Sequence, residues 1–194
     1  TEVTPDLVEM EKPDAVVVAT GSQAGPCYLP GAGLPHVFTL YQALAGCEIP
    51  GDRVLVVDDT GFHQGAGTAE YLSRLGKKVT LLTPGLYPGQ DLMPTMDLPL
   101  WYRRALDQGI EMVTSSIVKS IDQNSVTVFN HYTGQETVLA GITAVVLVGQ
   151  PRAREEIYHQ LKGKVPEIYR VGDCLAPRRV EHAIYDGFKV GRSI

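Results

Sequence analysis

The 194-residue sequence contains little cysteine, no long apolar run and no excess of positive charge. Its three cysteines, Cys27, Cys47 and Cys174, form no C-x-x-C pair, which argues against a disulfide scaffold or a metal cluster and fits a reducing cytoplasm. No stretch approaches the roughly 18 apolar residues of a membrane span, and no basic-then-apolar leader opens the chain. We therefore expect a cytoplasmic protein without metal ligands or a membrane partner.

The charge balance is acidic. A formal net charge of −5 at pH 7 argues against nucleic acid as the main partner. Hydrophobic residues make up 44% of the chain and charged residues 20%, which is ordinary for a globular protein that buries one large core or two small ones. Because Thr1 is not methionine, we expect a segment that was processed or cut from a longer chain.

A strand, a glycine-bearing turn, a helix and a second strand follow one another in residues 53–83. Val54–Val57 is a continuous apolar run, which suits a strand buried on both faces. Thr68–Leu75 has the apolar spacing of a helix that ends at Gly76, and Val79–Leu82 is a second apolar run. This β-α-β order within about 30 residues is typical of units that bind dinucleotides.

The turn of this unit lacks the chemistry of a working dinucleotide site. A G-x-G-x-x-G run should follow the strand directly, so that bare backbone can approach the pyrophosphate. Instead, Asp58–Thr60 precedes the first glycines, Gly61 and Gly65, and residues 82–84 read Leu-Thr-Pro where an acid should accept the ribose. Carboxylates at the phosphate position would repel an anion. The residues favour a degenerate, structural unit, and a site that still binds some nucleotide through Gly61 and Gly65 stays open.

Apolar patterning predicts further elements before and after this unit. The expected strands are Asp14–Thr20, Ile110–Thr114, Val118–Ile121, Ser125–Asn130, Thr137–Ala140, Ala144–Val148 and Ile168–Val171. The expected helices are Phe38–Ala45, Leu98–Gln108, Glu155–Leu161 and Val180–Arg192. Thr1–Lys12 predicts a frayed lead-in, Gly85–Pro99 predicts a long loop, and Pro50–Asp52 predicts a domain boundary.

Two strand ends carry candidate ligand contacts. Residues 16–21 read VVVATG and residues 168–173 read IYRVGD. Ligands of open α/β sheets lie beyond the carboxyl ends of the strands, so Thr20 with Gly21, and Gly172 with Asp173, are candidate nucleotide contacts. The Asp173 carboxylate can accept hydrogen bonds from ribose or ribityl hydroxyl groups.

These motifs resemble a known family. DAVVVATGS, RVLVVDDTG and the closing run VGDCLAPRRVEHAIYDGFKVGR look like the C-terminal half of flavin-dependent oxidoreductases in the trimethylamine dehydrogenase and 2,4-dienoyl-CoA reductase group. The resemblance implies an α/β fold of two nested Rossmann-like (FAD/NAD(P)-binding) three-layer domains, the second inserted into the first. Residues 1–49 and 151–194 would form the FAD/ADP-binding-type domain, and residues 50–150 the inserted NAD(P)-binding-like domain.

The same resemblance implies the site and its cofactors. The four strand-end residues would belong to a bipartite site for FAD or ADP, with Ala176 and Arg178 facing the pyrophosphate or ribose. An FMN-binding barrel and a 4Fe-4S cluster would lie upstream of Thr1. No catalytic base or nucleophile is carried over to this segment, because the chemistry belongs to the barrel.

Within the group, the turn decides the branch. The reductase branch keeps an intact glycine turn for NADPH, whereas the amine dehydrogenase branch has a degenerate turn and passes electrons to an electron-transfer flavoprotein. Asp58–Gly61 resembles the second branch, so binding of NAD(P)H is doubtful. We expect a non-catalytic C-terminal segment of an amine dehydrogenase or demethylase, with its own barrel, an electron-transfer flavoprotein and a second copy as partners. An NAD(P)H-dependent enoyl or dienoyl reductase, and a stand-alone nucleotide- or protein-binding module, stay open as alternatives.

Overall fold

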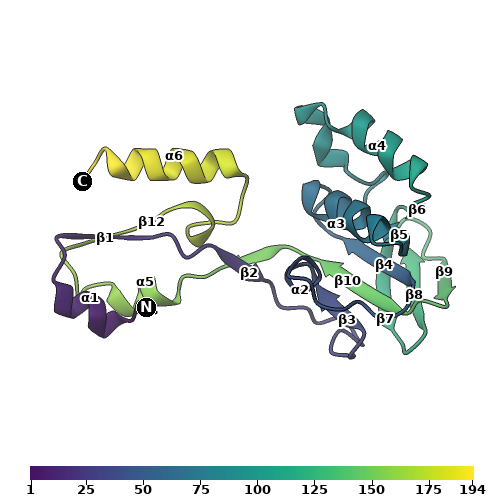
Figure 1. Cartoon of the computed structure of the whole chain (residues 1–194), viewed down its shortest axis with the longest axis horizontal. Helices are drawn as coiled ribbons and strands as arrows, with labels where there is room; N and C mark the ends of the chain where they lie inside the picture. The colour runs from purple at the N-terminus through teal and green to yellow at the C-terminus, as the bar shows by residue number, and fades with distance from the viewer. The chain divides into compact units, whose positions relative to one another are not determined.

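The computed structural model describes all residues, 1–194, and they form two compact units. Unit 1 consists of residues 1–25 and 151–194, and unit 2 of the intervening residues 26–150. Both termini of the chain therefore belong to unit 1 (Figure 1). None of the helices is both long enough and apolar enough to cross a membrane.

Unit 2 is built on a five-stranded parallel sheet with the strand order β3-β10-β4-β5-β6. Its strands are β3 (Val37–Thr39), β4 (Arg53–Asp58), β5 (Lys78–Leu82), β6 (Glu111–Val113) and β10 (Ala144–Val148). Its helices are α2 (Leu40–Leu44), α3 (His63–Arg74), the 3-10 helix η1 (Gln90–Thr95) and α4 (Leu98–Asp107). An antiparallel meander follows β6 and consists of β7 (Ser116–Ile121), β8 (Ser125–Asn130) and β9 (Glu136–Ala140).

The two faces of the parallel sheet bury different partners, which makes unit 2 a three-layer structure. On β4, Val54 and Val56 belong to a core shared with helices α3 and α4, whereas Leu55 and Val57 belong to a core shared with the meander. Side chains alternate between the faces of a strand, so a strand buried on both sides must be apolar throughout. Each such side chain contributes about 1.5–3 kcal/mol on burial.

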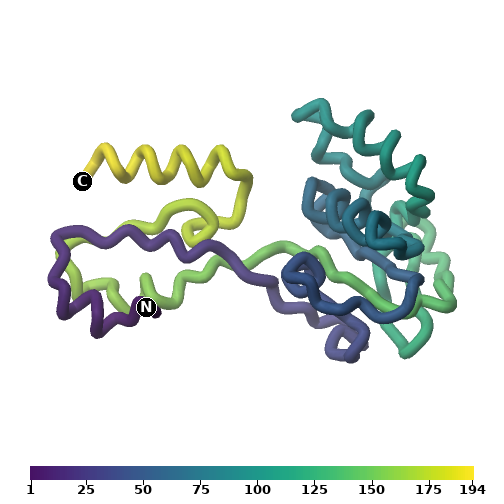
Figure 2. The backbone as a smooth tube through the Cα atoms, viewed as in Figure 1, coloured from purple at the N-terminus to yellow at the C-terminus, as the bar shows by residue number.

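Unit 1 contains a two-stranded parallel sheet and a short antiparallel pair. The parallel strands are β1 (Ala15–Val18) and β12 (Glu167–Arg170), and the antiparallel ones are β2 (Ser22–Ala24) and β11 (Pro151–Ala153). The helices are α1 (Pro5–Glu11), α5 (Glu156–Leu161), the 3-10 helix η2 (Gly172–Cys174) and α6 (Val180–Gly191). Figure 1 shows α1 and α5 on one side of the β1–β12 pair and α6 on the other. Segments from the first and last parts of the chain, β1 and β12, thus run side by side within this unit (Figure 2).

Most of the expected elements are present, and two expectations about irregular segments are wrong. The segment Thr1–Lys12 contains helix α1, because the Thr4 hydroxyl accepts a hydrogen bond from the Leu7 amide at 3.3 Å and Pro5 begins the helix. The segment Gly85–Pro99 contains η1, which buries Leu92 in the helical core of unit 2. The first helix was not predicted because its segment is polar, and the second was not predicted because its segment contains several prolines.

The fold class is a mixed α/β, Rossmann-like FAD/NAD(P)-binding fold with a parallel sheet, as expected. The break between the units lies at residues 25 and 26, whereas the expected domain boundary lies at 49 and 50. The difference arises because β3 pairs with β10 and α2 packs beside it, so residues 37–44 complete the sheet of unit 2. Assignment of the two domains by function stays a prediction.

Candidate functional site

The parallel pairing of β1 and β12 brings the two predicted strand ends to one edge of unit 1. Val18 lies opposite Arg170 in the register, and the Val171 amide donates to the Val18 carbonyl at 3.1 Å. Just beyond this point, the Ser22 hydroxyl donates to Oδ2 of Asp173 at 2.9 Å. Segments separated by about 150 residues of sequence are therefore joined directly at the position where ligands of α/β sheets bind.

Two carboxylates organise the loop that follows β12. Oδ1 of Asp173 accepts the Arg178 amide at 3.2 Å. Oδ2 of Asp186, on α6, accepts the Gly172 amide at 3.2 Å and the Arg178 guanidinium at 2.5 Å. The Arg178 Nε also donates to the Ala176 carbonyl at 3.2 Å. The predicted residues of this loop are thus brought together, and Arg178 is held in one orientation by its own neighbours.

The backbone at Gly21 and Gly172 explains why glycine occupies both strand ends. Their φ angles are +74° and +61°, in the left-handed region that favours glycine. A Cβ atom on Gly172 would also come within 3.2 Å of the Ala183 Cβ on α6, whereas the space around Gly21 is open. Gly172 therefore permits the close approach of α6, and Gly21 leaves bare backbone facing open space.

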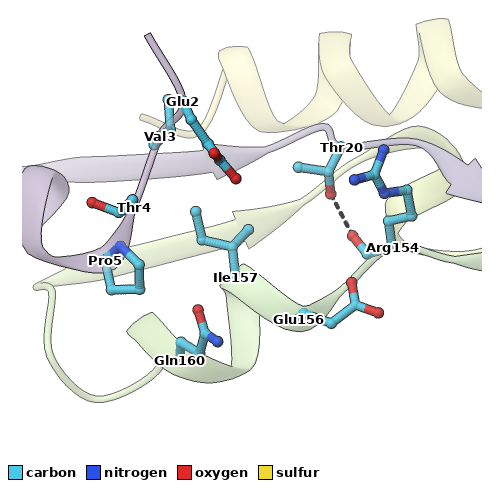
Figure 3. A pocket seen from close by; sticks show the side chains of 9 residues that line it. All are labelled: Glu2, Val3, Thr4, Pro5, Thr20, Arg154, Glu156, Ile157 and Gln160. Carbon is cyan, nitrogen blue, oxygen red and sulfur yellow. Dashed lines mark hydrogen bonds between the residues drawn. The ribbon is translucent and has the colours of Figure 1, made fainter.

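A cavity of about 490 Å³ in unit 1 includes Thr20 in its lining (Figure 3). The Thr20 hydroxyl donates to the carbonyl of Arg154, and these two residues lie at one end of the cavity, with Pro5 and Gln160 at the other. The lining also includes Glu2 and Glu156. The mixed charge of this lining identifies no particular ligand. The cavity lies next to the carboxyl ends of β1 and β12, which we call the strand-end edge, and gives that edge a concave surface.

The turn after β4 in unit 2 is occupied by its own carboxylate. Asp58 is fully buried, and its Oδ1 accepts the Thr60 amide at 2.9 Å, the Thr60 hydroxyl at 2.6 Å and the Gly61 amide at 3.1 Å. These amide donors follow the strand directly, where a working turn offers its backbone to a phosphate. The amide donors of Thr60 and Gly61 in this turn are therefore already used by a side chain of the protein itself.

The electrostatics of this turn also oppose an anion. Burial raises the pKa of Asp58, and the nearby Asp91 carboxylate adds to the rise. Oδ2 of Asp58 has no hydrogen-bond partner. Partial desolvation raises the pKa of Asp59, although its side chain is exposed, and Asp58 adds to the rise. Three carboxyl groups gathered around the turn disfavour a phosphate there, so the residues do not fit the pyrophosphate of NAD(P)H.

Gly61 lies in this turn and Gly65 at the start of helix α3, and both contribute to packing. A Cβ atom on Gly61 would come within 3.2 Å of the Gln90 side chain, and Gly61 has a φ of +64°. Gly65 lies in the first turn of α3 against the Asp58 carboxyl group. Binding of a cofactor by either glycine stays a prediction.

Sequence reasoning missed two residues of the strand-end edge, Ser22 and Asp186. Ser22 follows the Thr-Gly pair directly, and Asp186 belongs to the closing Ala-Ile-x-Asp-Gly run, so both lay within recognised motifs. Their partners were not apparent because each hydrogen bond joins segments that meet only in the folded unit. Cys174 is buried and its Sγ lies 3.3 Å from the Arg154 carbonyl, which fits a structural role.

Comparison with known proteins matches residues 6–187 to the family described as pyridine nucleotide-disulphide oxidoreductase. Among curated proteins, N,N-dimethylglycine/sarcosine dehydrogenase of Chromohalobacter salexigens is 26% identical over a match that covers 92% of this chain and 31% of that protein, in its C-terminal part. The chain thus spans about a third of the length of this relative.

Two solved structures are also similar. The structure of 6-hydroxypseudooxynicotine amine oxidase from Pseudomonas geniculata N1 has a TM-score of 0.93 and 33% identity, covering 98% of this chain and 30% of that one. The 2-naphthoyl-CoA reductase structure has a TM-score of 0.90 and 27% identity, covering 100% of this chain and 29% of that one.

Proposed function

Because the chain belongs to the pyridine nucleotide-disulphide oxidoreductase family, we propose that it is the C-terminal nucleotide-binding part of a longer FMN/4Fe-4S flavoprotein oxidoreductase. The branch is that of amine dehydrogenases and demethylases. The observation that carries this choice is the Asp58 carboxylate, which saturates the turn where a reductase would hold NAD(P)H. The segment itself supplies no catalytic residue, and the FMN and the cluster, held upstream, would supply the redox chemistry.

In this proposal the two units are nested domains with different roles. Unit 1 is the FAD/ADP-binding-type domain, and unit 2 is an NAD(P)-binding-like domain inserted into it that has lost its ligand. Electrons would leave through an electron-transfer flavoprotein, because a turn filled by the Asp58 carboxyl group would not hold a nicotinamide cofactor. The active protein would be a homo-oligomer in the cytoplasm.

The strand-end edge of unit 1 fits an adenine nucleotide, as ADP or as part of FAD. Asp173 uses one hydrogen bond per oxygen, so its carboxylate keeps acceptor capacity for ribose hydroxyls. Thr20 and Gly21 lie at the same edge, and the Arg178 guanidinium, positioned by Asp186, provides a cation for the pyrophosphate. These residues bind and orient the nucleotide and carry out no chemical step.

An NAD(P)H-dependent reductase is the second candidate, supported by the similarity to 2-naphthoyl-CoA reductase. The two candidates differ in what unit 2 binds, since only the reductase would bind NAD(P)H there. A third candidate is a stand-alone, non-enzymatic module, for which the native polypeptide would be no longer than this chain.

The test is intact-mass spectrometry of the native polypeptide from its source cells, followed by nucleotide titrations. We expect a mass several-fold above 21.1 kDa, saturable binding of ADP and no binding of NADH. Replacement of Asp58 and Asp59 by glycine should then help to restore dinucleotide binding. Saturable NADH binding by the unaltered protein would support the reductase, and a native mass near 21.1 kDa would contradict the multidomain proposal.

A further inference from the structure

Strand β9 of the meander has an unpaired edge. The strand order β7-β8-β9 places it on the outside of this sheet (Figure 1). Every residue of β9 except Leu139 is exposed. A strand edge of this kind presents N–H and C=O groups that can bond to another strand, and proteins normally protect such edges with proline, charge, a bulge or short length.

The other edges of unit 2 are protected in these ways. The outer strands of the parallel sheet, β3 and β6, are each only 3 residues long. Strand β7, at the opposite side of the meander, has an irregular register and carries Lys119, and its Ile121 amide donates to the Pro30 carbonyl at 2.9 Å. Strand β9 keeps a regular register with β8, contains no proline, and pairs the charge of its Glu136 with Lys119. The edge of β9 is therefore open, and its one charge is balanced.

Alternation along β9 determines which backbone groups face the open edge. The Asn130 amide donates to the Gln135 carbonyl at 2.9 Å, and the Gly141 amide donates to the Asn124 carbonyl at 2.8 Å. Hydrogen-bonded pairs of an antiparallel ladder recur at every second residue, so the odd-numbered residues of β9 bond to β8. The amides and carbonyls of the even-numbered residues point to the open edge: Glu136, Val138 and Ala140.

We propose that β9 pairs in antiparallel fashion with β9 of a second copy, with a two-fold axis passing beside Val138. In this register Val138 of one copy bonds to Val138 of the other, and Glu136 bonds to Ala140, so every outward amide and carbonyl has a partner. A two-fold interface uses the same surface on both copies, and an antiparallel pair of identical strands has this symmetry. The two meanders then form one continuous sheet.

The side chains of β9 fit this occupant. Val138, which is β-branched and 59% exposed, meets its own copy across the axis, and contacts between such side chains stabilise paired strands. The long side chain of Glu136 faces the small side chain of Ala140, and the two copies of Glu136 lie at opposite ends of the pairing, so no like charges are opposed. A register centred elsewhere on β9 would leave outward groups unpaired. This self-complementary pattern favours a second copy over a strand of unrelated sequence.

The inference rests on the proposed function in one respect, since it gives an interface to the homo-oligomer proposed there. Its test is hydrogen exchange at single-residue resolution on the native polypeptide, combined with sedimentation over a dilution series. We expect the amides of Val138 and Ala140 to exchange at least about 10-fold more slowly in the dimer than in the diluted monomer. The Leu139 amide, which bonds to β8 in both states, is the internal reference.

Two variants at one position separate pairing from folding. Val138→Pro removes the N–H group that faces the open edge and leaves the bonds between β8 and β9 in place, so the dimer dissociation constant should rise roughly 10- to 100-fold. Val138→Thr keeps the N–H group and the β-branched shape and should leave the dissociation constant unchanged. Thermal unfolding of both variants checks that unit 2 is intact.

A charge pair at the axis gives an independent check. Val138→Lys alone should weaken the dimer roughly 10-fold because two like charges meet at the axis, and Val138→Glu alone should do the same. An equimolar mixture of these two variants should recover most of the loss, because opposite charges then face each other. A mixture that forms no tighter dimers than either variant alone would overturn the proposed pairing.

The outcomes separate this inference from the proposed function. A native dimer that Val138→Pro leaves unchanged would overturn the inference and leave the proposed function standing. Protection of the Val138 amide in a monomeric polypeptide would assign the edge to another segment and would also overturn pairing with a second copy. A native mass near 21.1 kDa would instead contradict the multidomain proposal, and loss of the dimer in Val138→Pro would still support pairing through β9.

Discussion

The carboxyl group of Asp58 occupies the space that a side chain on Gly65 would need. A Cβ atom on Gly65 would lie 2.0 Å from Cγ of Asp58 and 2.3 and 2.4 Å from its two oxygens. In a working dinucleotide turn, a glycine at the start of the helix permits close packing of helix on strand. In unit 2, Gly65 still permits a close approach to helix α3, but the group that lies against it is the carboxyl group of Asp58.

Gly65→Ala should therefore destabilise unit 2 by about 1–3 kcal/mol, because neither α3 nor the buried carboxyl group can move freely. The double variant with Asp58→Ala should recover part of this loss, giving a coupling energy in urea denaturation. Gly67→Ala is the control, since a Cβ there would meet nothing within 4 Å and alanine favours the helix. Equal costs at the two glycines would contradict the packing role of Gly65.

Asp58→Asn should change how stability depends on pH. Because burial raises the folded-state pKa of Asp58, the folded protein binds a proton more readily than the unfolded chain. The native protein should therefore gain stability relative to the variant as the pH falls from 7 through the folded-state pKa. Denaturation at several pH values measures the difference, with exposed Asp52→Asn as the control. A difference that is constant with pH, or that changes in the opposite direction, would refute the burial of a charge at Asp58.

Glu70→Gln should have the opposite pH signature. Burial favours the neutral form of Glu70, but hydrogen bonds and ion pairs with Arg104 and Arg74 outweigh it and lower the pKa. The Arg104 contact is two-pronged, at 2.8 and 3.2 Å, and joins α4 to α3. Because the arginines are partly exposed, we expect a loss of roughly 1 kcal/mol at pH 7.

This contribution of Glu70 is present above its unfolded-state pKa and is lost as the pH falls through the lowered folded-state pKa. The variant and the native protein should therefore converge in acid, as measured by denaturation at pH 7 and in acid. Glu48→Gln, at an exposed position, is the control. A penalty for Glu70→Gln that persists at low pH would indicate lost packing rather than lost charge.

Asp173→Ala should weaken binding of ADP to the native polypeptide by about 10- to 100-fold, because a charge-assisted hydrogen bond contributes roughly 1.5–3 kcal/mol. Asp173→Asn keeps an acceptor oxygen and should lose less. Asp14→Ala removes an exposed carboxylate just before β1, at the opposite end of the strand from the site, and should leave the affinity unchanged. Calorimetric titration distinguishes these outcomes, and unchanged affinity in Asp173→Ala would remove this residue from the site.

The apolar runs by themselves determined the parallel sheet of unit 2. A strand such as β4, buried on both faces, must be apolar at every position, and that pattern is local and readable. The same holds for the degenerate turn, because the absence of glycine directly after a strand is visible in the chain. The polar lead-in was misread because the cap of α1 depends on one threonine, whose hydrogen bond adds no apolar pattern.

The tertiary structure alone decided which polar groups meet. Ser22 reaches Asp173, and Asp186 reaches Gly172, only because β1 and β12 pair in parallel and α6 returns over their ends. It also decided that the Asp58 carboxyl group is turned inward onto the amides that follow it, so that it occupies the donors a phosphate would need. Local spacing encodes which face of a strand or helix is apolar, whereas hydrogen bonds between distant segments depend on register and crossover. Those relations are set by packing of the whole unit.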